Sequence, residues 1–192
     1  MKNKLLLSIV LFCFAWLGVA RADVVQIGET GALGELPIKS DWSYFLTQQI
    51  YDADEIGTSG TISAVSFYFV VDDEDNESFS LDGLQVYMKN VDKDVFANDT
   101  DMEPLNASDK VWEGSFAAAA PGWVTITLDT PFEYDGTSNL LVAFFDPTEE
   151  SLGIGSRFYA DFSLPNKAMG YYHNRFIPDL ENPVNYQGYK QV

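Results

Sequence analysis

The side chains that could do chemistry in this sequence are almost all carboxylates. The chain has 29 Asp and Glu residues but only one histidine and one cysteine. His173 lies among aromatic residues in "YYHNRF", where a surface or packing histidine is several times more common than a general base. No Gly-x-Ser-x-Gly sequence is present, which argues against a serine hydrolase of that type. Since so many acids place some pair at glycosidase separation by chance, we expect no enzyme activity and keep a carboxylate-dependent glycosidase as a remote alternative.

Acidic loops also raise the question of calcium, which binds several oxygen ligands and often ties loops together in exported domains. The acidic stretch "DDEDNES", residues 72–78, is not an EF-hand loop, because its sixth position is Glu77 rather than glycine. We interpret it as a solvated loop. A structural calcium site would instead combine residues that bracket one predicted strand and its turn, with a plain solvated turn as the alternative. The candidate ligands are Asp135, Asn139 and Asp146.

Sugar recognition requires flat aromatic faces with amides or carboxylates beside them. Two aromatic residues in the polar stretch "KSDWSYF" fit this requirement best, and a second aromatic group follows near the C-terminus, with Tyr186 as a further member. Trp112 and Trp123 open predicted strands, and we predict that they cap the core. The predicted ligand-binding residues are Trp42, Tyr44, Gln48, Tyr171 and Tyr172.

The N-terminus predicts export. Lys2 and Lys4 precede an apolar run that closes on Ala20-Arg21-Ala22, a small-x-small cleavage signature. An uncleaved anchor is the alternative, but spanning a bilayer takes about 20 apolar residues and this run is shorter. We therefore predict a removed signal peptide, residues 1–22, a single domain, residues 23–192, and a secreted or cell-surface location. The cysteine, Cys13, lies in the signal peptide, so the domain must be held by its core rather than by disulfides.

The charge balance limits the partners. The formal net charge is −18, from 11 basic and 29 acidic side chains. Cleavage after Ala22 would remove three of the basic residues and leave a net charge of −21. A surface this negative repels nucleic acid and anionic membranes, and it favours cations and neutral partners such as glycans.

The elements that must position these residues are strands. Short runs of Val, Ile, Tyr, Phe and Thr alternate with Gly, Asp, Asn and Ser clusters, which predicts an all-β fold: a jelly-roll β-sandwich of about eight antiparallel strands in two sheets. A glycine-rich segment, residues 28–34, lacks the spacing of a phosphate loop and is interpreted as flexible. The predicted strands are Phe45–Tyr51, Thr61–Val71, Leu84–Asn90, Val111–Phe116, Trp123–Asp129, Leu140–Asp146, Arg157–Phe162 and Ala168–Tyr172.

The stretch "GWVTITLDTPFEYDGTSNLLVAFFD" shows this pattern most clearly. Val124, Ile126 and Leu128 alternate with polar residues, so one face of their strand should be buried and the other exposed to solvent. "LLVAFF" is apolar throughout and belongs in the centre of the sandwich. Pro131 should end the first strand, because proline cannot donate to the hydrogen-bond ladder.

Four stretches, "LTQQIYDADEIG", "GTISAVSFYF", "LQVYMKNVDKDVF" and "GWVTITLDTPFEYDGTSNLLVAFFD", resemble the β-jelly-roll modules of secreted and surface proteins of gut and oral bacteria. These modules are similar in architecture to the cleaved-adhesin domains of gingipain-type haemagglutinins. The resemblance covers residues 28–183 and implies an extracellular module with an adhesive or carbohydrate-binding role. Two departures are the loop "FDPTEES" and the absence of an apolar closing strand, which suggests a C-terminal truncation.

We therefore predict an exported, non-enzymatic adhesion or carbohydrate-binding module. Its partner would be a glycan or a host surface protein, with no nucleic acid and no membrane insertion. The alternative is a structural, accessory or assembly domain of a larger surface protein, without a ligand of its own.

Overall fold

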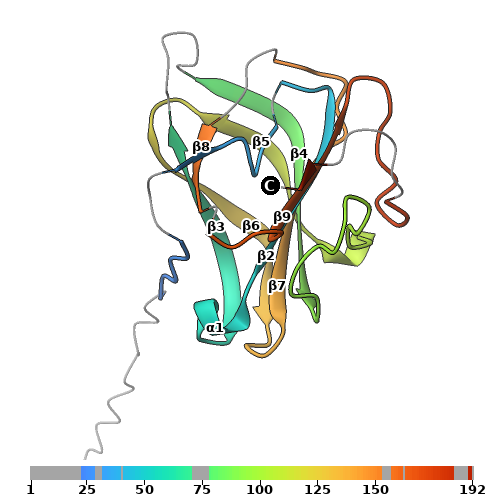
Figure 1. The fold of residues 1–192 in the computed structure, drawn as a ribbon. Helices are drawn as coiled ribbons and strands as arrows, with labels where there is room; N and C mark the ends of the chain where they lie inside the picture. Colours follow the sequence, from blue (N-terminus) through green and yellow to red (C-terminus); the bar gives the residue numbers. More distant parts are fainter. Residues whose placement is uncertain are drawn as a thin grey trace, which may run out of the picture.

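Two antiparallel sheets pack into a β-sandwich in the computed structural model, which confirms the predicted fold class (Figure 1). The structure describes residues 23–28, 32–39, 41–70, 78–152, 157–161, 163–183 and 190–191. The predicted signal peptide, Cys13, the acidic residues 72–77 and Tyr186 therefore lie outside the described residues. Within the described ranges, no helix has the length and apolar character needed to cross a membrane.

The smaller sheet has four strands, in the spatial order β1-β8-β3-β6. They are β1 (Ala32–Gly34), β8 (Arg157–Ala160), β3 (Gly60–Val70) and β6 (Gly122–Tyr134). The larger sheet has six strands, in the order β10-β9-β2-β7-β4-β5. They are β10 (Lys190–Gln191), β9 (Ala168–His173), β2 (Tyr44–Tyr51), β7 (Asn139–Asp146), β4 (Phe79–Val91) and β5 (Lys110–Ala118). Two short helices, α1 (Ala53–Ile56) and η1 (Ala107–Asp109), lie in the connections.

The first eight strands pair in a nested order. β4 pairs with β5, β3 with β6, β2 with β7 and β1 with β8. Successive pairs of this nest lie alternately in the six-stranded and the four-stranded sheet. The chain thus folds as one long hairpin wrapped over itself, and β9 and β10 extend the larger sheet beyond β2.

All eight predicted strands are present, but β4 begins at Phe79 rather than at Leu84, the predicted end of β6 was wrong, and one strand was missed. Strand β6 does not end at Pro131; it continues to Tyr134, past a register shift opposite Ile62 and Ala64. Proline is tolerated there because β6 is an edge strand with an irregular ladder. The segment interpreted as flexible contains β1, which pairs with β8. Strand β1 has only three residues, which is too short for an alternation of apolar and polar residues to predict it.

The apolar core lies in two clusters, one on each face of the larger sheet. Ile126, Leu128 and Phe144 lie in the cluster between the sheets, as the alternation predicts. Phe145 points the other way and joins a second cluster, which is covered by the connection between β4 and β5. Phe96, Met102 and Leu105 of that connection are buried against β2, β7 and β9. Burial of both faces explains why "LLVAFF" is apolar throughout.

The outer face of the four-stranded sheet is exposed instead. Ser66 of β3 and Thr125 and Thr127 of β6 are exposed and alternate with core residues. Side chains on this face are carried by paired strands and point to solvent, so the sheet holds them in fixed positions relative to one another.

Candidate functional site

A row of apolar and aromatic side chains crosses the outer face of the four-stranded sheet, with one residue from each strand. Leu33 of β1 is the partner of Tyr159 of β8, and Tyr68 of β3 is the partner of Trp123 of β6. Tyr68 joins the two halves, because its ring lies 4.8 Å from that of Tyr159 and 5.5 Å from that of Trp123, centroid to centroid. We call Leu33, Tyr159, Tyr68 and Trp123 the platform.

The platform is accessible to a ligand. Trp123 is 55% exposed and Leu33 is 43% exposed, while Tyr68 and Tyr159 are half-buried. The Tyr68 ring is tilted by 30° to Tyr159 and meets Trp123 edge to face at 82°. These contacts between neighbouring strands hold the rings in place before a ligand arrives.

The prediction that Trp123 caps the core was wrong. Trp123 has the same strand parity as Thr125 and Thr127, which are exposed, whereas Val124 and Ile126 pack toward the core. The alternating pattern already contained this information. The prediction gave more weight to the general tendency of tryptophan to be buried than to its position in the strand.

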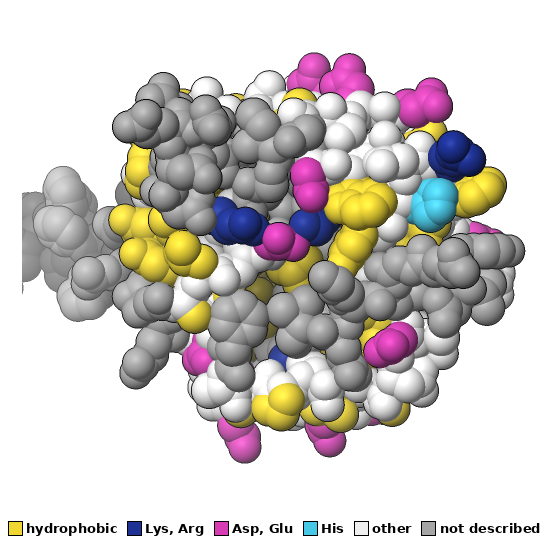
Figure 2. All heavy atoms as spheres, turned by 45° about the horizontal axis from the view of Figure 1, so that its top comes forward, with side chains coloured by type: hydrophobic (Ala, Val, Ile, Leu, Met, Phe, Trp, Pro, Cys, Tyr) yellow, Lys and Arg dark blue, Asp and Glu magenta, His cyan; other side chains and the backbone are white. Residues whose placement is uncertain are grey.

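Paired charges border one side of the platform. Arg157 lies two residues before Tyr159 on β8, and its Nη1 atom lies 2.9 Å from Oε1 of Glu35. Glu35 also forms an ion pair with Lys39, and Lys39 Nζ lies 3.2 Å from Asp41 Oδ1. Figure 2 shows Lys or Arg side chains next to Asp or Glu side chains, with hydrophobic groups on either side, on the face that it draws. Hydrogen bonds and attraction from Lys39 and Arg157 outweigh burial and lower the pKa of Glu35, so it is ionised at neutral pH.

Neutral hydroxyls border the other side. Ser66 and Thr125 lie two residues from Tyr68 and Trp123, on the same face, and their hydroxyl oxygens are hydrogen bonded at 2.8 Å. Each hydroxyl keeps further donor or acceptor capacity that a ligand could use.

Two predicted residues meet at the end of the sandwich. The rings of Trp42 and Tyr172 lie 5.2 Å apart at 43°, and Lys39 Nζ lies 5.4 Å from the Tyr172 ring centroid. Both aromatic residues are half-buried, and Tyr172 packs against the core. Burial, followed by the negative charges of Glu35 and Asp41, raises the pKa of the Tyr172 phenol to about 12. This pair closes the core more than it offers an open binding surface.

The other predicted ligand-binding residues lie elsewhere. Tyr44 pairs with His173 in the β2–β9 ladder. Its side chain lies on the face of the larger sheet that carries the second cluster, whereas Tyr172 lies on the opposite face. Tyr171 is fully buried in that cluster and donates a hydrogen bond to the carbonyl of Phe176 at 2.9 Å. The predicted set therefore does not form one surface.

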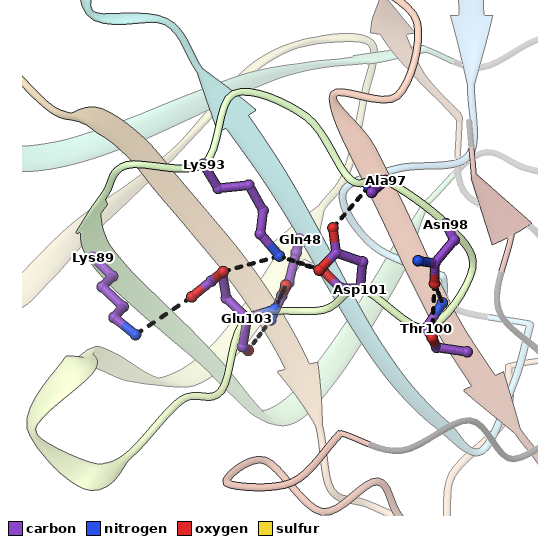
Figure 3. Close-up of polar contacts among 8 residues, drawn as sticks. All are labelled: Gln48, Lys89, Lys93, Ala97, Asn98, Thr100, Asp101 and Glu103. Carbon is purple, nitrogen blue, oxygen red and sulfur yellow. Dashed lines mark hydrogen bonds and ion pairs between the residues drawn. The ribbon is translucent and has the colours of Figure 1, made fainter.

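Gln48 belongs to a polar network that fastens the covering connection to the larger sheet (Figure 3). Its buried amide donates to the carbonyl of Glu103 and accepts from the N–H of Glu103, both at 2.8 Å. Nearby, Lys93 Nζ lies 2.7 Å from Asp101 Oδ1 and 2.9 Å from Glu103 Oε1. Burial alone would lower the pKa of Lys93, but hydrogen bonds and attraction from Asp101 and Glu103 raise it.

The predicted calcium ligands are not brought together. Asn139 begins β7 and Asp146 ends it, and at roughly 3.3 Å per residue they are about 23 Å apart. Asn139 binds the N–H of Ala53 at 2.9 Å and the carboxylate of Asp94 at 2.9 Å. Asn139 lines an open depression of about 480 Å³ beside α1. Lys167 and Asp52, which also line this depression, form an ion pair.

The two carboxylates of the predicted set differ sharply. Asp135 is exposed and accepts hydrogen bonds from the N–H groups of Thr137 and Ser138, both at 2.7 Å, which lower its pKa to about 2. Asp146 is fully buried, and burial raises its pKa. No group of three or more His, Cys, Asp and Glu residues is placed to hold a metal within the ranges that the structure describes.

Searches against protein-family models, curated proteins and solved structures found no match to this chain. What the chain can bind must therefore be inferred from its own surfaces. Among those described above, the platform combines exposed rings, fixed geometry and neighbouring hydroxyls, which together suit the apolar face and the hydroxyl groups of a sugar.

Proposed function

We propose that this protein is an exported, non-enzymatic module that binds carbohydrate on the outer face of its four-stranded sheet. The observation that carries the proposal is the platform: Trp123, Tyr68 and Tyr159 lie in one row on three neighbouring strands, with Trp123 more than half exposed. A soluble domain gains nothing in its own stability from exposing such a ring, so exposure in a fixed row favours a binding role.

We also infer that the sandwich is a jelly roll, of the kind that the sequence resembles. The nested pairing of β1 to β8 and its alternation between the two sheets support this inference. In such a fold the sheets form a rigid scaffold, and a ligand-binding surface can be added to one face without changing the core.

An assembly or accessory domain is the second candidate, because an exposed apolar row also fits a protein partner. The neutral hydroxyls of Ser66 and Thr125 beside the rings favour a sugar, since they can replace water around its hydroxyl groups. The two candidates differ in whether the isolated protein binds any glycan.

The test is a glycan-array screen of the purified protein and of Trp123→Ala. Because Trp123 is exposed, we expect the variant to keep the melting temperature of the wild type but to lose about tenfold or more in affinity for each bound glycan. Thr127→Ala is the matched control, because Thr127 is exposed on the same face and strand but outside the row. It should bind as the wild type does.

Two results would contradict the proposal. Glycan binding that survives Trp123→Ala would move the site away from the platform. A folded wild-type protein that binds no glycan on the array would favour the assembly domain.

A further inference from the structure

We propose that the platform selects uncharged glycans over anionic ones, and that Glu35 determines this selectivity. The inference rests on the proposed function, because it concerns the ligand class of the same surface. It starts from the ion pairs that border the platform.

Arg157 is placed where it would contact a ligand on the platform. Phe158 is fully buried in the core, so its neighbours Arg157 and Tyr159 both point outward from β8. Arg157 is also the ladder partner of Val70, two residues beyond Tyr68 on β3. Its side chain is 33% exposed. A guanidinium beside an aromatic row would ordinarily attract a carboxylate or sulfate on a sugar.

Glu35 cancels that attraction. One carboxylate oxygen lies 2.9 Å from Arg157 Nη1, and the other pairs with Lys39 Nζ. The Glu35 side chain is 44% exposed, so its charge lies at the surface that a ligand would contact. The lowered pKa of Glu35 keeps the carboxylate ionised at neutral pH. Lys39 is paired in turn with Asp41 at 3.2 Å, so the charges of the two basic and two acidic side chains named here cancel.

The rest of the molecule adds to the discrimination. With a formal net charge of −18, the protein repels any anion that approaches it. The other border of the platform, Ser66 and Thr125, supplies neutral hydroxyls. An uncharged glycan is not repelled by the negative charge of the protein. A uronic acid or sulfated chain is repelled, and Arg157 and Lys39 do not compensate for this repulsion because Glu35 forms an ion pair with each of them. Removal of the Glu35 charge should therefore favour anionic ligands specifically.

The experiment compares wild type with Glu35→Gln on an array that carries neutral hexose glycans and their uronic acid counterparts, with affinities then measured by titration calorimetry. We expect the wild type to bind neutral glycans and to bind their uronic acid counterparts more weakly. The variant should bind the uronic acid glycans roughly threefold to tenfold more tightly than the wild type does, with neutral binding nearly unchanged. Raising the salt concentration should reduce this gain.

Glu181→Gln is the matched control, because it makes the same chemical change at an exposed position next to Leu180, which packs on the opposite side of the sandwich. It should leave both affinities unchanged. Melting temperatures show whether each variant is folded.

The outcomes separate this inference from the function on which it rests. A wild type that binds no glycan at all overturns the proposed function. A wild type that binds neutral glycans overturns the inference alone if it binds anionic glycans equally well, if Glu35→Gln leaves the preference unchanged, or if Glu181→Gln shifts it equally.

Discussion

At the scale of single residues, Gln48 shows how a polar side chain can serve the fold. It is fully buried, and its amide satisfies both backbone groups of Glu103. Gln48→Leu removes both hydrogen bonds and leaves the Glu103 backbone groups without them. We expect the free energy of unfolding to fall by about 2–3 kcal/mol, measured by urea denaturation.

The control for Gln48 is Glu103→Gln, which keeps the backbone contacts and removes only the partly exposed ion pairs with Lys89 and Lys93. It should cost less than about 1 kcal/mol. Equal stability of Gln48→Leu and the wild type would show that the covering connection is held by its apolar residues alone.

Asp146 gives a pH-dependent prediction. Because burial raises its folded pKa above the ordinary value of 3.8, the folded state binds this proton more tightly than the unfolded state does. The ionised carboxylate therefore penalises stability as pH rises from 3.8 through the folded pKa, and the penalty persists at pH 7. We expect Asp146→Asn to be more stable than the wild type at pH 7. The difference should shrink as the pH falls toward 4 in denaturation series at several pH values.

The reverse result would be informative for Asp146. Lower stability of the variant at pH 7 in the presence of calcium, but not with a chelator, would mean that the carboxylate binds a cation, as the sequence led us to expect. Lower stability of the variant both with calcium and with the chelator would mean that the wild-type carboxylate is stabilised by hydrogen bonding.

At the scale of elements, the turn between β6 and β7 has a narrow steric tolerance. Gly136 has φ of +75°, and a Cβ atom there would lie 2.5 Å from Cβ of Ser59. We expect Gly136→Ala to lower the free energy of unfolding by about 2 kcal/mol, from both the backbone conformation and the contact. In the double variant with Ser59→Gly the 2.5 Å contact is removed, while Cα and N of residue 59 stay 3.1 Å and 3.2 Å from the new Cβ, so about half of the loss should return. No recovery would assign the cost to the backbone conformation of residue 136 and to these remaining backbone contacts.

The strands were predictable because their signal is local. Eight runs of alternating or continuous apolar residues gave eight strands within a few residues of their boundaries. Strands β1 and β10 have three and two residues, too few to show a period, and they exist because β8 and β9 offer partners. Pro131 was misjudged because its effect depends on whether β6 has a neighbour on that side, which is a property of the sheet.

The candidate site was less predictable for the same reason. The sequence indicates which residues of a strand share a face, but it does not indicate which face another part of the chain covers. Tyr171 and Tyr68 both lie on strands among aromatic neighbours. Tyr171 is buried under the covering connection, whereas Tyr68 lies on the open sheet. The platform also joins four strands that are distant in sequence, so only the fold brings its residues into a row.

At the scale of the whole molecule, the excess of acids should control stability. The chain has 29 acidic and 11 basic side chains, so most carboxylates have no cation to pair with, and folding brings like charges together. Salt screens this repulsion, since the screening length falls from about 30 Å at 0.01 M to about 8 Å at 0.15 M. We therefore expect the melting temperature at pH 7 to rise by a few degrees over this range of NaCl, measured by calorimetry.

The control for this prediction is the same salt series near pH 4.1, the pI of the chain, where the net charge is close to zero and the gain should vanish. Salt also weakens attractive pairs, such as Lys93 with Asp101 at 2.7 Å, and these oppose the expected rise. If the melting temperature at pH 7 fell with salt, the few ion pairs would outweigh the repulsion among all the unpaired acids. The stability of this fold would then depend on its charged networks, and the border of the platform would contribute to stability as well as to the ligand selection proposed for it.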